Sequence, residues 1–143
     1  MENVKLFVAT KAFIVHEGKV LIIRESNTYA DGTKFEKFDL PGGRLKPGEQ
    51  FNESLIREVR EETGLEISIE RPIHVDEWKP KVRGEQWQIV GIFFICRATS
   101  TAVVLSQDHD AYEWIDPREC RKYNLMDNYF RAFELYLEYE TKQ

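Results

Sequence analysis

Apolar residues along the chain fall into runs with the length and spacing of β-strands. Residues 4–23 contain two such runs, and the polar residues 16–19 between them predict a β-hairpin. Residues 65–75 alternate apolar and polar side chains, as a half-buried strand does. Residues 88–98 are almost continuously apolar, which favours a central strand buried on both faces.

Two segments have the periodicity of helices. Within residues 43–65, one side of a helix would carry the apolar residues Leu55, Ile56 and Val59. Gly64 stands where a left-handed residue can end this helix without a Cβ penalty. Asn52, or a residue just before it, is expected to cap the N-terminus. Residues 128–140 form a second, broadly apolar helix whose aromatic side chains are expected to pack in the core.

The other side of the first helix is strongly acidic. Glu58, Glu61 and Glu62 fall within an arc of roughly 100° when residues are placed at 100° steps. Like charges at this spacing destabilise a helix by roughly a few tenths of a kcal/mol each. Mg²⁺ or Mn²⁺ would compensate, because these hard cations prefer carboxylate oxygens. A solvated acidic face without a ligand is the alternative that this pattern alone leaves open.

Composition narrows the class of protein. A chain of 143 residues has the size of one domain, 1–143, and 42% hydrophobic and 31% charged residues are typical of a globular protein. The longest apolar run, residues 89–96, is too short to span a bilayer, and no secretory leader opens the chain. We therefore expect a cytoplasmic protein with no membrane partner. Cys96 and Cys120 lack the spacing of a zinc or redox site.

The net charge of −5 bears on the partners of the protein. It provides no electrostatic footprint for nonspecific binding to nucleic acid, so no stable nucleic-acid partner is expected. It would also repel a polyphosphate, unless bound cations reverse the local potential. The acidic helix is the place where such cations could bind.

The segment 43–65 also carries a specific motif. It reads Gly, five residues, Glu, seven residues, Arg-Glu-apolar-any-Glu-Glu-any-Gly-apolar, without a mismatch. This pattern is the defining box of the Nudix hydrolases, which the chain therefore resembles. Residues 38–43 resemble the aromatic-any-apolar-Pro-Gly-Gly approach to that box, and residues 112–115 resemble the strand that follows the substrate loop in the family.

The resemblance implies a fold and a cofactor. The fold is α/β, a Nudix-type α/β/α sandwich with a mixed β-sheet between helices. The cofactor is Mg²⁺, for which Mn²⁺ can substitute, held by Glu58, Glu61 and Glu62 with Asp108 assisting. A backbone carbonyl of the turn at Gly42 and Gly43 joins the metal ligands in some members, and Gly43 is the candidate here.

The resemblance also points to catalytic residues. Glu58 occupies the box position that deprotonates the attacking water in some members, but Asp108 or Glu113 could take that role in this chain. Arg57 and Glu49 are expected to orient the metal-binding carboxylates, because a bidentate guanidinium can fix a carboxylate rotamer. A purely structural role for this pair is compatible with the same sequence.

Candidate substrate contacts lie at strand ends and in connections. Arg24 ends a strand at a point where family members often reach phosphate, and a solvated strand end is the alternative. Trp78 and Trp87 belong to a basic connection that suits stacking on a base, although both could face the core of a hairpin tip. Tyr29 and Phe35 either close over a base or pack into the core.

These observations favour an enzyme that acts on a small-molecule nucleotide. The leading hypothesis is Mg²⁺-dependent hydrolysis of a diphosphate bond in a nucleoside diphosphate linked to another moiety, most simply a nucleoside triphosphate. An ADP-ribose or nucleotide-sugar pyrophosphatase is the alternative, because Pro80 is reminiscent of ADP-ribose-cleaving members. A catalytically silent nucleotide-sensing module is an alternative of another class. The sequence leaves both a monomer and a homodimer open.

Overall fold

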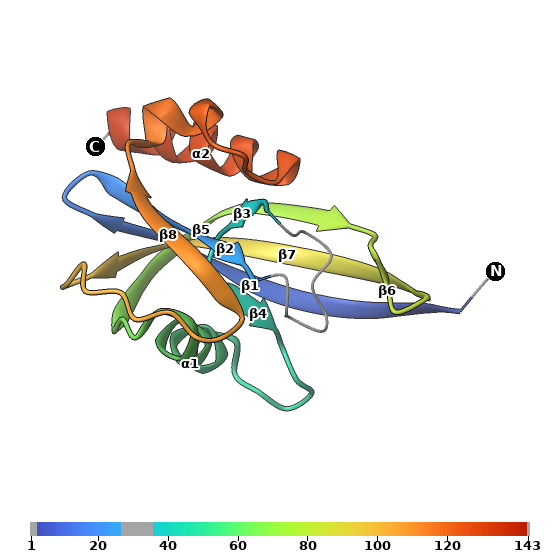
Figure 1. The fold of residues 1–143 in the computed structure, drawn as a ribbon. Helices are drawn as coiled ribbons and strands as arrows, with labels where there is room; N and C mark the ends of the chain where they lie inside the picture. The colour runs from blue at the N-terminus through green and yellow to red at the C-terminus, as the bar shows by residue number, and fades with distance from the viewer. Residues whose placement is uncertain (1–2, 27–35, 143) are drawn as a thin grey trace.

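A mixed β-sheet lies between two α-helices in the computed structural model, which describes residues 3–26 and 36–142 (Figure 1). Helix α1 (Phe51–Thr63) covers one face of the sheet, and helix α2 (Asp127–Thr141) covers the other. The expected α/β/α sandwich is therefore confirmed. The described strands are β1 (Val4–His16), β2 (Lys19–Glu25), β3 (Phe38–Asp39), β4 (Gly42–Arg44), β5 (Ile67–Trp78), β6 (Lys81–Val82), β7 (Glu85–Ala98) and β8 (His109–Ile115).

The sheet is built around one long parallel pair. Strands β1 and β7 pair from Val4 opposite Gln86 to Val15 opposite Arg97. Strand β5 lies antiparallel along β7, while β2 follows β1 and pairs with β3 and β8. The short strand β4 pairs with residues 9–11 in the middle of β1. This pairing fixes the turn that precedes α1 against the centre of the sheet.

The strand predictions were partly right. The hairpin turn at residues 16–19 is confirmed, with His16 opposite Lys19 and a left-handed Gly18 (φ 79°). Strand β5 starts two residues later than expected and continues to Trp78, so the expected connection at 77–87 is mostly strand. Its turn is reduced to Arg83 and Gly84, which both have positive φ. Polar residues on the exposed side of these strands hid the alternation of apolar and polar residues by which a strand is predicted.

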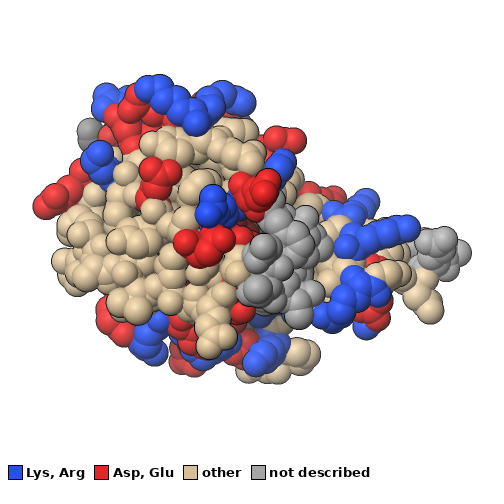
Figure 2. Space-filling view, viewed as in Figure 1, with Lys and Arg blue, Asp and Glu red and all other residues tan. Residues whose placement is uncertain are grey.

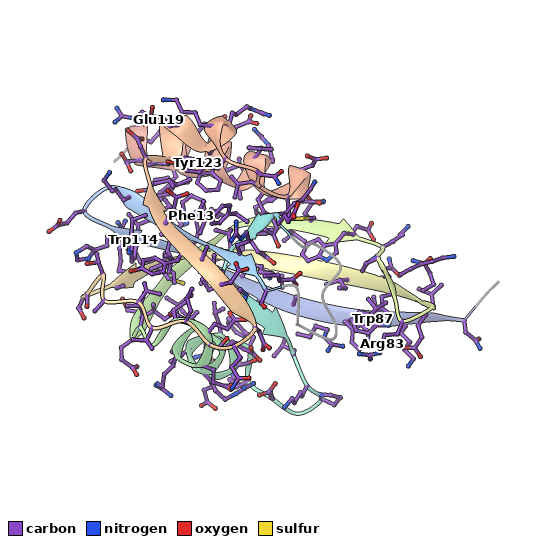
Figure 3. All side chains as sticks on the ribbon, in the orientation of Figure 1. Phe13, Arg83, Trp87, Trp114, Glu119 and Tyr123 are labelled. Atoms are coloured by element: carbon purple, nitrogen blue, oxygen red, sulfur yellow. The ribbon has the colours of Figure 1, made fainter. Side chains whose placement is uncertain are left out.

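Strands β1 and β2 place successive apolar residues on opposite faces of the sheet. The face toward α2 receives Phe13, Val15, Val20 and Ile22, and the face toward α1 receives Ala12, Ile14, Leu21 and Ile23. The aromatic residues of α2 pack on the first of these faces, as expected, and Figure 3 shows Phe13 between the sheet and that helix. The apolar runs in β1 and β2 are continuous because each strand supplies side chains to the core under α1 and to the core under α2.

The helix ends are set by local interactions. Gly64 ends α1 in the left-handed conformation (φ 73°) and donates its N–H to the carbonyl of Arg60, as expected. Of the two expected N-cap positions, Asn52 is wrong and a residue just before it is right: Gln50 is the N-cap, without a side-chain cap hydrogen bond, and its carbonyl accepts the N–H of Ser54. Helix η1 (Pro117–Lys122) precedes α2 and is capped by Asp116. Within the described residues, every helix is too short or too polar to cross a bilayer.

Charged side chains of both signs lie mostly around the edges of the face seen in Figure 2, and a broad area between them is uncharged. Lys and Arg side chains gather over the helices at one side and over the end formed by β1, β6 and β7. The net charge of −5 is therefore not spread as a uniformly acidic surface on this face.

The packing predicts that truncation of Phe133 will destabilise the fold. Its side chain is fully buried, and its ring centroid lies 4.7 Å from that of Phe13. Phe133→Ala should lower the free energy of unfolding by about 3–5 kcal/mol in urea titrations, because it leaves a cavity between α2 and the sheet. Phe130→Ala, on the half-buried side of the same helix, is the matched control and should cost less. Equal losses for the two variants would contradict this view of the core.

Candidate active site

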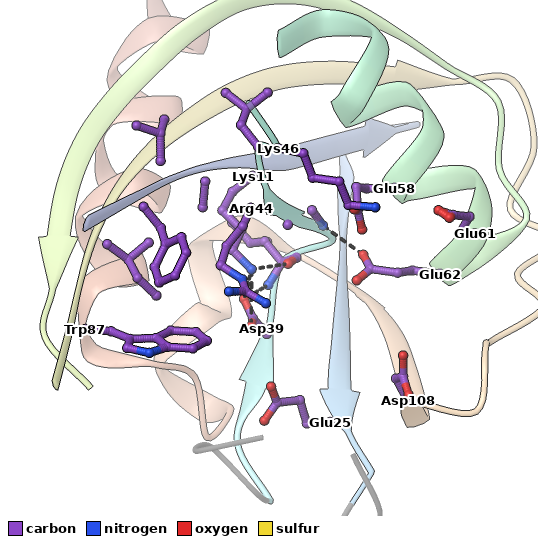
Figure 4. A pocket seen from close by; sticks show the side chains of 18 of the residues that line it. Lys11, Glu25, Asp39, Arg44, Lys46, Glu58, Glu61, Glu62, Trp87 and Asp108 are labelled. Atoms are coloured by element: carbon purple, nitrogen blue, oxygen red, sulfur yellow. Dashed lines mark hydrogen bonds and ion pairs between the residues drawn. The ribbon is translucent and has the colours of Figure 1, made fainter. Parts of the chain in front are cut away.

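An open cleft of about 840 Å³ runs from the acidic side of α1 to the outer half of β1 and β7. Figure 4 shows Glu58, Glu61 and Glu62 at one end and Trp87 at the other. The acidic residues that line the cleft are Glu25, Asp39, Glu49, Glu58, Glu61, Glu62 and Asp108, and the basic ones are Lys11, Arg44, Lys46 and Arg57. The fold therefore brings most of the predicted site residues into one continuous space.

The turn at Gly42 and Gly43 packs against β1 more closely than any side chain would allow. Gly42 has φ +144°, and a Cβ atom there would collide with the carbonyl oxygen of Thr10. A Cβ atom on Gly43 would lie 2.8 Å from Oε2 of Glu58. The two glycines thus let the backbone approach β1 on one side and the acidic helix on the other.

Glu62 is anchored to this turn. The N–H of Gly42 donates to Oε1 of Glu62 over 2.8 Å, and the side chain is half-buried. Burial raises the pKa of Glu62 to about 8, although the Lys11 ammonium and the Gly42 N–H both oppose the shift. A carboxylate in this position is therefore costly to charge in the absence of a cation.

The other two glutamates of the box differ in exposure. Glu58 is half-buried, and burial raises its pKa, with the Glu61 carboxylate adding to the shift and Arg57 opposing it. Glu61 is exposed and accepts a hydrogen bond of 2.6 Å from Nη1 of Arg57. The acidic side of α1 thus presents two desolvated carboxylates and one solvated carboxylate.

Arg57 joins these acids to the turn before the helix. Its Nη2 donates to Oε2 of Glu49 over 2.9 Å and lies 3.4 Å from Oε1 of Glu58. The other oxygen of Glu49, Oε1, accepts the backbone N–H of Lys46 over 2.8 Å. This N–H and the Arg57 guanidinium hold the pKa of Glu49 below its usual value, although burial opposes the shift. The geometry is that of a guanidinium held in place by one acid while it contacts two others.

The donor set fits a hard divalent cation. It consists of carboxylate oxygens, and two of the acids have raised pKa values that a nearby cation would reverse. Across residues 3–26 and 36–142, no three acidic, histidine or cysteine side chains already converge as a ready cation site. Both oxygens of Glu61 accept from Arg57, so cation binding there would require Glu61 to exchange partners, whereas Glu62 accepts the Gly42 N–H through Oε1 alone.

A buried ion pair that we did not predict lies at the floor of the cleft. Nζ of Lys11 is 3.2 Å from Oδ1 of Asp39 and donates to the carbonyl of Leu40 over 3.3 Å. Although burial lowers it, the Asp39 and Glu62 carboxylates hold the pKa of Lys11 above its usual value. A single lysine inside the apolar run of β1 was the available sequence signal, since a buried charge needs a partner.

The two tryptophans line the end of the cleft away from α1. Trp87 is buried and joins Ala9, Val82 and Ile89 in a small apolar cluster. Trp78 is half-buried and packs edge-on against Phe93 and Tyr129, close to Gly91, where a Cβ atom would collide with its ring. Both tryptophans therefore belong to the core and to the wall of the cleft at the same time.

The remaining predicted residues are dispersed. Asp108 is exposed and lines the cleft, as does His109 next to it in the chain. Arg24 donates to Asp110 over 2.8 Å and does not line the cleft formed by the described residues, and neither does Glu113. Tyr29 and Phe35 lie outside the described residues.

Comparisons with known proteins agree with this architecture. A family model described as NUDIX domain matches residues 5–136. The chain is 34% identical over 105 residues to the human 8-oxo-dGDP phosphatase NUDT18, a match that covers 73% of this chain and 29% of that protein. It is 27% identical over 123 residues to the nucleoside triphosphatase NudI of Klebsiella pneumoniae, covering 78% of this chain and 83% of that protein.

A solved structure also resembles the whole chain. The crystal structure of the MutT protein from Methanosarcina mazei Go1 superposes with a TM-score of 0.79 at 26% identity, covering 100% of both chains. The fold and the motif at residues 43–65 therefore point to the same family.

The raised pKa of Glu62 predicts a pH dependence of stability in the presence of a chelator. The pKa of Glu62 is about 8 in the folded chain and 4.5 for an ordinary glutamate. Between pH 4.5 and 8, the folded state therefore binds more protons than the unfolded state. The free energy of unfolding should therefore fall as the pH rises from about 5 to 8, by more than about 1 kcal/mol. Urea titrations across this range should show a shallower fall for Glu62→Gln, and parallel curves for the two proteins would contradict the assignment.

Proposed function

The chain belongs to the Nudix hydrolase family, and from this premise we propose that it is a divalent-cation-dependent pyrophosphohydrolase of nucleoside triphosphates or related small nucleotides. The continuity of the cleft carries this proposal. One end is lined by the glutamates of α1, and the other by Trp87 and its apolar neighbours. A molecule with phosphates on one side and a flat ring on the other matches both ends.

The relatives support a nucleotide substrate. NudI is named a nucleoside triphosphatase and is matched over 83% of its length, whereas NUDT18 is named an 8-oxo-dGDP phosphatase and is matched over 29%. Nucleoside triphosphates and diphosphates are therefore both candidates. Pro80 lines the cleft, which keeps ADP-ribose and nucleotide sugars as the second candidate class.

We assign the cation to the acidic end of the cleft. Glu58, Glu61 and Glu62 would hold Mg²⁺ or Mn²⁺, and Asp108 and the carbonyl of Gly43 would be further oxygen donors. When bound, the cation would neutralise phosphate oxygens and lower the pKa of the attacking water.

The residues around this position have distinct roles in the proposal. Glu58 lines the cleft beside the Gly43 turn and occupies the box position that deprotonates the attacking water in some Nudix members, so it is our choice for the general base. Asp108 is the competing base because it also lines the cleft. Arg57 and Glu49 would orient Glu58, and the exposed Lys46 would contact substrate phosphate.

A substrate panel tests the proposal directly. Nucleoside triphosphates, nucleoside diphosphates, ADP-ribose and nucleotide sugars would be incubated with Mg²⁺, with Mn²⁺ or with EDTA, and the products separated by chromatography. We expect a nucleoside monophosphate and pyrophosphate from a triphosphate, with no turnover in EDTA. Preferential cleavage of ADP-ribose would favour the second class. Nucleotide binding without any turnover would indicate a sensing module and overturn the proposal.

Replacement of Glu62 tests the role of the acidic helix. Glu62→Gln keeps an oxygen that can accept the Gly42 N–H, so the fold should be retained, as judged by circular dichroism. The loss of one carboxylate charge from the cation site should lower kcat by about 10²- to 10³-fold. Glu53→Gln is the matched control, because Glu53 is an exposed acid in the first turn of the same helix and does not line the cleft. Equal activities of the two variants would show that Glu62 has no part in the reaction.

A further inference from the structure

Arg44 lies across the aromatic end of the cleft. Its guanidinium carbon is 4.4 Å from the ring centroid of Trp87 and 4.8 Å from that of Phe7. The two rings are themselves in contact, with centroids 4.6 Å apart at an angle of 57°. A single cation therefore covers a pair of aromatic rings, in the manner of a cation–π contact.

This arrangement changes which surface a ligand can reach. Trp87 is only 5% exposed, whereas Arg44 is half-buried and lines the cleft. Figure 4 places Arg44 between Trp87 and the glutamates of α1. A flat group that enters this end of the cleft would therefore meet the guanidinium before it could meet the indole.

The surroundings of Arg44 suit a planar, largely apolar group. Ala9, Val82 and Ile89 form an apolar wall with Trp87, and the half-buried Trp78 packs against it. The glutamates that would hold cations and phosphates lie at the opposite end of the cleft. Arg44 extends from β4, which is directly joined to the Gly42 turn, so its backbone is fixed relative to both ends.

We propose that the guanidinium of Arg44, backed by Trp87 and Phe7, is the platform on which the nucleobase stacks, and that it favours purines over pyrimidines. This inference rests on the function proposed above. A guanidinium is planar and weakly hydrated, so it stacks well on a π-face, whereas a lysine ammonium is a compact, strongly hydrated charge. A purine covers more of such a platform than a pyrimidine does.

Binding of reaction-product analogues separates this role from a contact with phosphate. Calorimetric titrations would compare GMP, CMP and the base-free analogue ribose 5-phosphate for the parent and for Arg44→Lys, which keeps the charge and loses the planar group. Base stacking on an aromatic platform is worth about 10-fold in affinity, so the variant should bind GMP about 10-fold more weakly. The loss should be smaller for CMP and absent for ribose 5-phosphate.

Arg121→Lys is the matched control. The Arg121 guanidinium also lies 4.4 Å from an aromatic centroid, that of Phe130, but it does not line the cleft. This variant should bind all three ligands as the parent does. Urea titrations of both variants would confirm that each is folded under the binding conditions.

The other outcomes overturn the inference. An equal loss for GMP and ribose 5-phosphate would assign Arg44 to the phosphate, and unchanged GMP binding would show that the base does not stack there. A parent that binds GMP no better than ribose 5-phosphate would also refute it. Because these titrations need no turnover, their failure is distinguishable from failure of the substrate panel, which tests hydrolysis itself.

Discussion

The close approach of the Gly42 turn to the centre of β1 is the constraint on which the site depends. The N–H of Ala12 donates to the carbonyl of Pro41 over 2.7 Å, and β4 then pairs with residues 9–11. At this separation, only glycine fits at position 42, because a Cβ atom would collide with the Thr10 carbonyl. The same turn also orients α1, because the N–H of Gly42 donates to Glu62 and Gly43 lies against Glu58. The acidic side of the helix therefore takes its position from backbone contacts.

The partial burial of Glu62 beside this turn makes its carboxylate costly to charge, which favours a site for a cation over maximum stability. Burial raises the pKa of Glu62 to about 8, while Lys11 and the Gly42 N–H oppose the shift. Lys11 is itself buried, and the Asp39 carboxylate beside it favours its charged form, so Asp39, Lys11 and Glu62 form a chain of desolvated titratable groups from β3 through β1 to α1. An apolar replacement of such a chain is often neutral or stabilising in proteins. Its retention here is consistent with a site built for a cation.

The parts of this molecule that could be predicted are those encoded by local spacing. The acids of α1 follow from helical periodicity, and Gly64 follows from the backbone conformation needed at a helix end. The pairing of Lys11 with Asp39 could not be predicted, because it depends on the pairing of β3 with β2 and of β4 with β1, which brings together residues 28 apart in the sequence. The contact of Arg44 with Trp87 depends on β1 lying between β4 and β7. The sequence left the N-cap open between Asn52 and a residue just before it, and a backbone hydrogen bond to the Gln50 carbonyl starts the helix at Phe51.

Strand β1 links the two ends of the cleft. Its middle residues 9–11 pair with β4 and so position the acids, and its outer half carries Phe7, which packs on Trp87 beneath Arg44. Twelve consecutive residues of β1 pair in parallel with β7, so these two regions cannot slide relative to one another without breaking the central ladder. The distance between the proposed cation-binding end and the proposed stacking platform is therefore set by one rigid strand. A ligand whose phosphates and ring are spaced differently would reach only one of the two ends, which gives the cleft a means of selecting by length as well as by chemistry.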